Sequence, residues 1–276
     1  MRPRYSFSSR RNRHIDKIKK QKSKYSELHE KIIESSDIIL EILDARFPEE
    51  TRNLEIEEEI KKRKKILVYV LNKSDLVINK KTYGYKNLTP KILVSCKDRK
   101  GIKNLRDLIK KLSKKIPLEE NKKVFVGVIG YPNTGKSSLL NILIGKSSAG
   151  VGSEAGFTKG IQKIKLTENI VLIDSPGVIP KEKYSQEQKD KISEQTIAGG
   201  RSYTQVKDPE LVVQSIMEKY PEILEKYYKI NANGNSEYLI EKLGKSRGFL
   251  KKGGFVDEDK TARLILKDWQ KGNIKI

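Results

Sequence analysis

A glycine-rich segment at residues 130–137, Gly-Tyr-Pro-Asn-Thr-Gly-Lys-Ser, contains the residue types that bind phosphate. The strand-like run KVFVGVI precedes it, and SSLLNILI, which has helical character, follows. In this context glycines let backbone N–H groups surround phosphates at the positive end of a helix. We expect Lys136 to neutralise charge on the β- and γ-phosphates and the Ser137 hydroxyl to ligate Mg²⁺. The predicted nucleotide contacts here are Gly130, Tyr131, Pro132, Asn133, Thr134, Gly135, Lys136, Ser137 and Ser138.

A second segment with chemical potential, Asp174-Ser-Pro-Gly177, begins at the last residue of the apolar run NIVLID. A carboxylate at a strand end beside the phosphate loop can hold Mg²⁺ through water. The N–H of Gly177, three residues later, can meet the γ-phosphate. Taken alone, the four residues are equally compatible with an ordinary turn.

A third segment, Asn72-Lys73-Ser74-Asp75, directly follows the run ILVYVL. Asp75 can accept two hydrogen bonds from guanine, at N1–H and at the exocyclic 2-amino group, which adenine lacks. A buried carboxylate that adenine leaves unpaired provides the discrimination. The aliphatic stem of Lys73 can lie along the plane of the base. In isolation, these residues also suit a strand followed by a capped helix start.

A fourth segment, Ser95-Cys96-Lys97, ends another strand-like run, where the Cys96 N–H could donate to guanine O6. A triplet is too short to identify a site without the other segments. All four lie at the ends of predicted strands, which is where ligands bind in open α/β sheets. Their joint occurrence predicts a GTP site.

Short apolar runs rich in Ile and Val predict the strands that position these residues. The runs are 38–43, 66–71, 92–94, 124–129 and 170–173. Helical patterns lie between them, and the clearest one places an apolar stripe along residues 102–116, opposite a lysine-rich face. Alternating strands and helices predict an α/β doubly wound domain with a mainly parallel sheet and helices on both faces.

The composition changes after Pro180, where the run KEKYSQEQKDKISEQ has no apolar periodicity. Asp208 and Pro209 suit a helix start, and Pro221 should interrupt the helix that follows. Another apolar face, Ala262, Ile265, Leu266 and Trp269, predicts a final helix. We therefore divide the chain into a basic arm (1–24), an α/β domain (25–182), a linker (183–205) and a small, mostly helical domain (206–276).

The net charge of the chain is formally +22, from 58 Lys and Arg against 36 Asp and Glu. Three segments hold nearly all of the excess: ten basic residues against one acid in 1–24, eight against one in 99–116, and ten against five in 241–276. Any one patch is as compatible with a solvated face as with a binding surface. Three patches around a near-neutral remainder favour a polyanionic partner, most simply nucleic acid.

Several classes of protein are disfavoured by the composition. Cys96 is the single cysteine, so no intramolecular disulfide framework or cysteine-rich zinc site is expected. No apolar run approaches the roughly 20 residues needed to span a bilayer. The N-terminal arm lacks both the apolar core of a secretory signal and amphipathic spacing. We expect a cytoplasmic protein that does not bind membranes.

The order of the four motifs is unusual, because the base-reading segments precede the phosphate loop and Asp174 comes last. An ordinary Ras-like GTPase begins with the phosphate loop. The sequence therefore resembles the circularly permuted GTPases, specifically the YlqF/YawG group that acts in large ribosomal subunit assembly. The resemblance covers nearly the whole chain. DIILEILDARFPEETRN (37–53) is similar to the opening strand and DAR-x-P segment of that group, and the segment 247–274 is similar to its C-terminal helical module.

The resemblance implies a function beyond nucleotide binding. It implies a circularly permuted P-loop GTPase domain, an RNA-associated C-terminal module and a factor that binds rRNA on the large ribosomal subunit or its precursor. GFTKGIQ is similar to the family's switch I segment, which makes Thr158 the second hydroxyl expected on Mg²⁺. DNA is not expected as a ligand, and a monomer is favoured.

The expected catalytic contributions come from Lys136, Thr158, Gly177 and Asn133. Asn133 matches the asparagine that ligates K⁺ in potassium-activated GTPases, and a cation there can share in charge stabilisation. Where Ras-like enzymes place a water-orienting glutamine, this chain has Val178, so slow intrinsic hydrolysis is expected.

Histidine gives no further catalytic candidate. The bacterial family's Pro-Gly-His motif is absent, and neither His14 nor His29 is assigned a catalytic role. The alternative function is therefore a GTP-dependent RNA-binding scaffold with little hydrolysis of its own.

Overall fold

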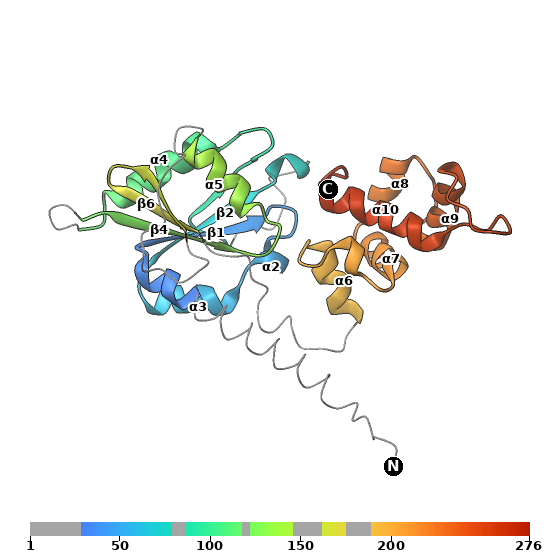
Figure 1. Cartoon of the computed structure of the whole chain (residues 1–276), viewed down its shortest axis with the longest axis horizontal. Helices are drawn as coiled ribbons and strands as arrows, with labels where there is room; N and C mark the ends of the chain where they lie inside the picture. Colours follow the sequence, from blue (N-terminus) through green and yellow to red (C-terminus); the bar gives the residue numbers. More distant parts are fainter. Residues whose placement is uncertain (1–28, 79–84, 86, 118–121, 146–161, 175–188) are drawn as a thin grey trace, which may run out of the picture.

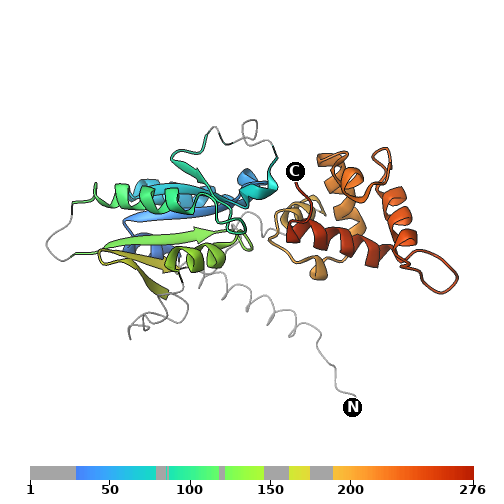
Figure 2. The same cartoon turned by 90° about the horizontal axis from the view of Figure 1, so that it is seen from above.

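The computed structural model describes residues 29–78, 85, 87–117, 122–145, 162–174 and 189–276. The described residues form two units that lie side by side in both views (Figure 1, Figure 2). We call those within 29–174 the α/β unit and those within 189–276 the helical unit. The basic arm 1–24, Thr158, Gly177 and Val178 lie outside the described residues.

A six-stranded sheet forms the centre of the α/β unit, with strand order β3-β2-β1-β4-β6-β5. The strands are β1 (Ile38–Asp44), β2 (Ile66–Asn72), β3 (Lys91–Leu93), β4 (Val124–Gly130), β5 (Gln162–Thr167) and β6 (Ile170–Asp174). Every neighbouring pair is parallel except β5 with β6. The predicted mainly parallel sheet is therefore confirmed.

Helices cover both faces of this sheet, as Figure 1 shows. One face packs against α4 (Ile102–Ser113) and α5 (Lys136–Ile144), and the other against the helical residues 29–35 and α3 (Leu54–Lys62). All seven residues of β1 are buried. Burial on both faces explains why the central strands have nearly continuous apolar sequences.

The edge strand β5 was not predicted from sequence. Its residues, QKIKLT, alternate between apolar and polar types. Ile164 and Leu166 pack against the core, whereas Lys165 is exposed. This alternation is typical of a strand buried on one face, and a search for continuous apolar runs does not detect it.

The helical unit contains α6 (Lys189–Ile197), α7 (Pro209–Lys219), α8 (Ile223–Tyr228), α9 (Ser236–Ser246) and α10 (Glu258–Lys271). The interruption predicted at Pro221 is confirmed, since it lies between α7 and α8. The predicted apolar face of the last helix is also confirmed, because Ala262, Ile265, Leu266 and Trp269 are all buried. The short α2 (Pro48–Thr51) follows β1 at the junction of the two units.

The structure differs from the predicted linker over residues 189–205, which contain α6 and the 3₁₀ turn Tyr203–Gln205. Ile197 is 4 % exposed and belongs to the core of the helical unit. α10 holds this segment through polar contacts: Trp269 Nε1 donates to the Ile197 carbonyl (3.1 Å), and Gln270 Nε2 donates to the carbonyls of Thr196 and Arg201 (2.9 and 2.8 Å). Hydrogen bonds of this kind leave no apolar periodicity in the sequence.

Phe47 joins the two units, because it comes from the α/β unit and is fully buried in the core of the helical unit. Its ring stacks on Trp269, with centroids 5.8 Å apart, and meets the edge of Tyr220 at 6.1 Å. Aromatic pairs at these separations add to the free energy of burial. The residue after the DAR sequence therefore anchors the helical unit.

Candidate nucleotide site

The phosphate loop leaves β4 at Gly130 and enters α5 at Lys136. Gly130 has φ +149°, and an added Cβ would lie 2.4 Å from the Ile42 carbonyl oxygen. Gly135 has φ +95°, and an added Cβ would lie 2.3 Å from Asn72 Nδ2. Both positions therefore require glycine for conformation and for space. The sequence prediction of a strand, a loop and a helix start is confirmed.

Lys136 lies within the loop and is 7 % exposed. Its Nζ donates to the carbonyls of Gly130 and Tyr131, at 2.9 and 2.8 Å. Burial lowers the Lys136 pKa to about 8, and the negative charge of Asp174 opposes that shift. Phosphate oxygens at this position would favour the charged ammonium group.

The predicted magnesium ligands come from the start of helix α5 (Ser137) and from the end of strand β6 (Asp174). Asp174 ends β6 and pairs in register with Val128 of β4, the strand that leads to the phosphate loop. Ser137 lies in the first turn of α5, where it is exposed. A hydroxyl and a carboxylate are oxygen ligands of the kind that Mg²⁺ prefers, so these residues fit the ion.

Asn72 ties three of the motifs together. Its Nδ2 donates to the Thr134 carbonyl of the phosphate loop at 2.8 Å, and its Oδ1 accepts from the Cys96 N–H at 3.3 Å. The side chain is buried. In this structure the Cys96 N–H, which we expect to reach guanine O6, is bonded to Asn72. Asn72 therefore braces the two ends of the site against each other.

Asp75 lies in the 3₁₀ turn Ser74–Leu76, which begins after Lys73 adopts a left-handed conformation (φ 60°). Ser95 Oγ donates to Asp75 Oδ1 at 2.7 Å, and the same hydroxyl oxygen accepts from the Asp98 N–H at 3.0 Å. This pair of bonds orients the carboxylate. A pocket of about 320 Å³ lies beside it, lined by Asn72, Lys73, Asp75, Leu76, Cys96, Lys97, Gly135, Ser138, Ile142, Lys271 and Gly272.

The pocket brings together residues from the two predicted base-reading segments and the phosphate loop. It also includes Lys271 and Gly272, which belong to the end of α10 and which the sequence analysis missed. No motif surrounds these two residues, and they lie far along the chain from the others. Only the folded arrangement of the two units identifies them.

Asp44 was also missed as part of the site. Its Oδ2 pairs with Arg46 Nη2 at 2.8 Å and with Lys73 Nζ at 2.9 Å. Burial raises the Asp44 pKa, but the charges of Arg46 and Lys73 outweigh that effect and lower it to about 2. The DAR sequence therefore holds the lysine that we expect to lie along the base.

The phosphate loop also contacts the helical unit. Asn133 Nδ2 donates to the Gly199 carbonyl at 2.7 Å. Tyr131 is 1 % exposed, and a Cβ added at Gly200 would lie 2.3 Å from its hydroxyl oxygen. The turn after α6 thus lies directly against the loop.

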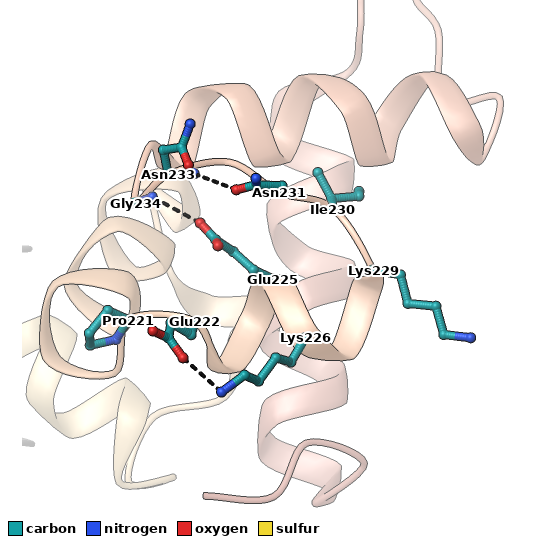
Figure 3. Close-up of a pocket in the computed structure, with 9 residues that line it drawn as sticks. All are labelled: Pro221, Glu222, Glu225, Lys226, Lys229, Ile230, Asn231, Asn233 and Gly234. Carbon is teal, nitrogen blue, oxygen red and sulfur yellow. Dashed lines mark hydrogen bonds and ion pairs between the residues drawn. The ribbon is translucent and has the colours of Figure 1, made fainter.

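Another pocket lies within the helical unit, beside α8 (Figure 3). Its acidic groups have local partners: Glu222 pairs with Lys226 at 2.7 Å, and Glu225 Oε1 accepts from the Gly234 N–H at 2.8 Å. None of the predicted nucleotide-binding residues lines it. Its acidic groups are therefore explained by the local fold.

Two other features bear on the predictions. His29 is 5 % exposed and lies in the helical segment 29–35 that packs on the sheet. Among the described residues, no helix has both the length and the apolar character needed to cross a membrane.

Comparison with known proteins gives a consistent result. Residues 125–240 match the family model described as a 50S ribosome-binding GTPase. An uncharacterized GTP-binding protein of Methanocaldococcus jannaschii is 41% identical over 88% of this chain and 64% of its own length. Nucleolar GTP-binding protein 2 of Neurospora crassa is 35% identical over 91% of this chain and 40% of its own length. The chain thus spans only part of the length of these relatives.

A solved structure has the same arrangement over nearly the whole chain. GNP-bound YlqF from T. maritima is 25% identical, with a TM-score of 0.59, and the match covers 93% of this chain and 94% of that one. The fold and the order of the site residues define a circularly permuted P-loop GTPase followed by a helical region. The chain therefore has the fold of the circularly permuted GTPases of the YlqF type, and the curated relatives that it resembles are GTP-binding proteins.

Proposed function

We propose that this protein binds GTP, hydrolyses it to GDP and phosphate, and uses the nucleotide state to control binding to the large ribosomal subunit or its rRNA during ribosome assembly. One observation carries the proposal: Asp75, oriented by Ser95, lies in a pocket that Asn72 connects to the phosphate loop. An oriented carboxylate favours guanine, and the loop with its lysine favours phosphate. The family description as a 50S ribosome-binding GTPase supports the ribosomal part.

The chemistry follows from the residues at the phosphate end. Backbone N–H groups at the start of α5 face the phosphates, and Lys136 leaves its carbonyl partners to neutralise their charge. Ser137, and Asp174 through water, would hold Mg²⁺, which when bound would further neutralise charge on the phosphate oxygens. We propose that Thr158 and Gly177 complete the contacts with Mg²⁺ and with the γ-phosphate.

K⁺ is proposed as a second cation, with Asn133 Oδ1 as its ligand. The Nδ2 atom of the same amide donates to the Gly199 carbonyl at 2.7 Å, which orients the side chain, and the amide oxygen is the atom of this group that can ligate a cation. Hydrolysis should then be faster in KCl than in NaCl at equal ionic strength. Indistinguishable rates in the two salts would remove K⁺ from the proposal.

The alternative, a GTP-dependent RNA-binding scaffold, is favoured by Val178, because an apolar side chain cannot orient the attacking water. A multiple-turnover assay with and without large ribosomal subunits separates the two functions. Release of many phosphates per protein in the presence of subunits supports the enzyme. Stoichiometric binding of GTP without turnover supports the scaffold.

The proposed RNA contact is the loop closed by the bridge between Leu250 and Val256 in the helical unit. Phe255 is 74% exposed, and Lys251 and Lys252 beside it are exposed as well. An exposed ring among lysines is suited to stacking on an unpaired base while the ammonium groups meet phosphates. We propose that this loop binds rRNA, with the protein acting as a cytoplasmic monomer.

Co-sedimentation with large ribosomal subunits tests this part. We expect stronger binding with a non-hydrolysable GTP analogue than with GDP, and release by high salt before nucleotide is lost. Phe255→Ala should weaken binding about tenfold, whereas Tyr238→Ala, an exposed aromatic at the other end of α9, should not. Equal sedimentation in both nucleotide states would exclude control by nucleotide.

A further inference from the structure

The residues after α10 lie against the turn that carries Asp75. The Ile276 N–H donates to the Leu76 carbonyl at 2.9 Å, and the Ile78 N–H donates to the Ile276 carbonyl at 2.8 Å. Leu76 directly follows Asp75 and ends the 3₁₀ turn. These two bonds therefore hold the backbone next to the base-reading carboxylate.

The segment that makes these bonds is fixed at its other end as well. Gly272 caps α10 with φ +74°, and an added Cβ would lie 2.6 Å from Leu76 Cδ1. Ile274 is 1 % exposed and belongs to the core of the helical unit. A short piece of chain is thus packed into one unit while it contacts the recognition turn of the other.

A second connection runs from α10 to the beginning of the same turn. Arg46 Nη1 donates to the Trp269 carbonyl at 3.0 Å, and the same guanidinium pairs with Asp44. Asp44 in turn pairs with Lys73 at 2.9 Å. The end of α10 is therefore connected to both neighbours of the Asp75 turn. It reaches Lys73 indirectly, through Arg46 and Asp44, and it lies against Leu76 directly, at Gly272.

We propose that the end of α10 and residues 272–276 position the guanine-reading turn, so that guanine selectivity depends on docking of the helical unit. The inference rests on the proposed function, because it concerns the same nucleotide site. By thermodynamic linkage, guanine nucleotide should in turn favour the docked helical unit. Ile276 is a positioning residue here, since it acts through the backbone of the turn.

The test compares GDP with inosine diphosphate, which lacks the 2-amino group that Asp75 reads. Ile276→Pro removes the N–H that donates to Leu76, whereas Ile276→Ala keeps that N–H and removes the side chain. Calorimetric titration should show that Ile276→Pro weakens GDP binding roughly threefold to tenfold, as expected for one misaligned hydrogen bond. Binding of inosine diphosphate should change less, and Ile276→Ala should keep the selectivity of the unmodified protein.

A second pair of variants tests the same segment from the other side of Leu76. Gly272→Ala places a methyl group against Leu76, while Gly248→Ala introduces alanine at a similar φ (+66°) after another helix, with open space around it. Only Gly272→Ala should reduce the preference for GDP over inosine diphosphate.

The outcomes separate this inference from the proposed function. If the unmodified protein prefers GDP to ADP but Ile276→Pro and Gly272→Ala keep its GDP preference over inosine diphosphate, the positioning role is wrong. If the unmodified protein binds GDP no better than ADP, the proposed function itself is wrong.

Discussion

The base end and the phosphate end of the nucleotide site contact the helical unit in different ways. At the base end, Phe47 is buried among the aromatic residues of the helical unit, and Arg46 donates to the Trp269 carbonyl. Ile276 forms two main-chain hydrogen bonds there, one with Leu76 and one with Ile78. Among the described residues at the phosphate end, the contacts are the Asn133 bond to Gly199 and the packing of Tyr131 on Gly200.

This comparison assigns different roles to the two ends. The buried Phe47 junction and the main-chain bonds of Ile276 resist displacement. At the phosphate end the exposed Asn133 amide can exchange its bond for water at low cost, which leaves the packing of the buried Tyr131 ring on Gly200. We therefore expect the base end to be the firmer attachment of the helical unit, and the phosphate end to be where a change in nucleotide alters the contact. A reorientation that followed loss of the γ-phosphate would begin at Gly199 and turn about Phe47.

The largest expected effect is at the firmer attachment. Phe47→Ala should lower the free energy of unfolding by about 3 to 5 kcal/mol, because it leaves a cavity beside Trp269. Urea denaturation followed by tryptophan fluorescence measures the change, with Trp269 as the chain's single tryptophan. Phe255→Ala removes the same group from an exposed position and should cost no more than about 0.5 kcal/mol. Equal costs for the two variants would contradict the anchoring role of Phe47.

At the phosphate end, Lys136→Ala should weaken GDP binding by about a hundredfold, because the phosphates lose a buried charged hydrogen-bond donor. Guanosine has no phosphate, so any weak binding of that nucleoside should be unchanged. Lys97→Ala, which removes a lysine from the base end of the pocket, is the matched control and should weaken GDP and guanosine alike. A proportional loss of guanosine binding in Lys136→Ala would show that the lysine supports the whole pocket instead.

A smaller effect concerns pH. Phosphate favours charged Lys136, so its pKa should rise on nucleotide binding from about 8 in the unliganded protein. Binding above pH 8 then takes up a proton, and GDP affinity should fall by up to about tenfold per pH unit there. Calorimetry at pH 8.5, where guanine N1 is still largely protonated, in buffers of different ionisation enthalpy measures this uptake, which Lys136→Ala should strongly reduce.

The same shift affects stability in the opposite direction. The Lys136 pKa in the folded protein lies below the usual value of 10.5, so the unfolded chain binds more protons between the two values. The unliganded protein should therefore gain stability from this residue as the pH rises from about 8 to 10.5. The measurement is the free energy of unfolding of the unmodified protein and of Lys136→Ala at several pH values between 8 and 10.5. If the difference between the two proteins does not change with pH, the buried environment of the lysine is contradicted.

The sequence was sufficient for the features that local patterns encode. The central strands, the phosphate loop and the Asp75 turn each depend on residues within about ten positions of one another, and their order identifies the permutation. The segments that contain Thr158 and Gly177 are predicted by resemblance, and their roles stay predictions.

The contacts between the units could not be predicted, for physical reasons that differ by case. The Ile276 bonds to Leu76 and Ile78 use backbone atoms, which every sequence possesses. α6 is held by Trp269 and Gln270 through its carbonyls, so it lacks the apolar stripe that marks other helices. Arg46 meets Trp269 only after both units have folded.

The most direct test of the central claim is the nucleotide selectivity of Asp75→Asn. Because Ser95 orients Asp75 beside the pocket, the unmodified protein should bind GDP at least about a hundredfold more tightly than ADP. An asparagine amide can instead donate to the 2-oxo group of xanthine, so Asp75→Asn should lose GDP affinity and gain affinity for xanthosine diphosphate. Asp98→Asn should retain the GDP preference. A variant at Asp75 that keeps its GDP preference would contradict the assignment of this turn as the guanine-reading element.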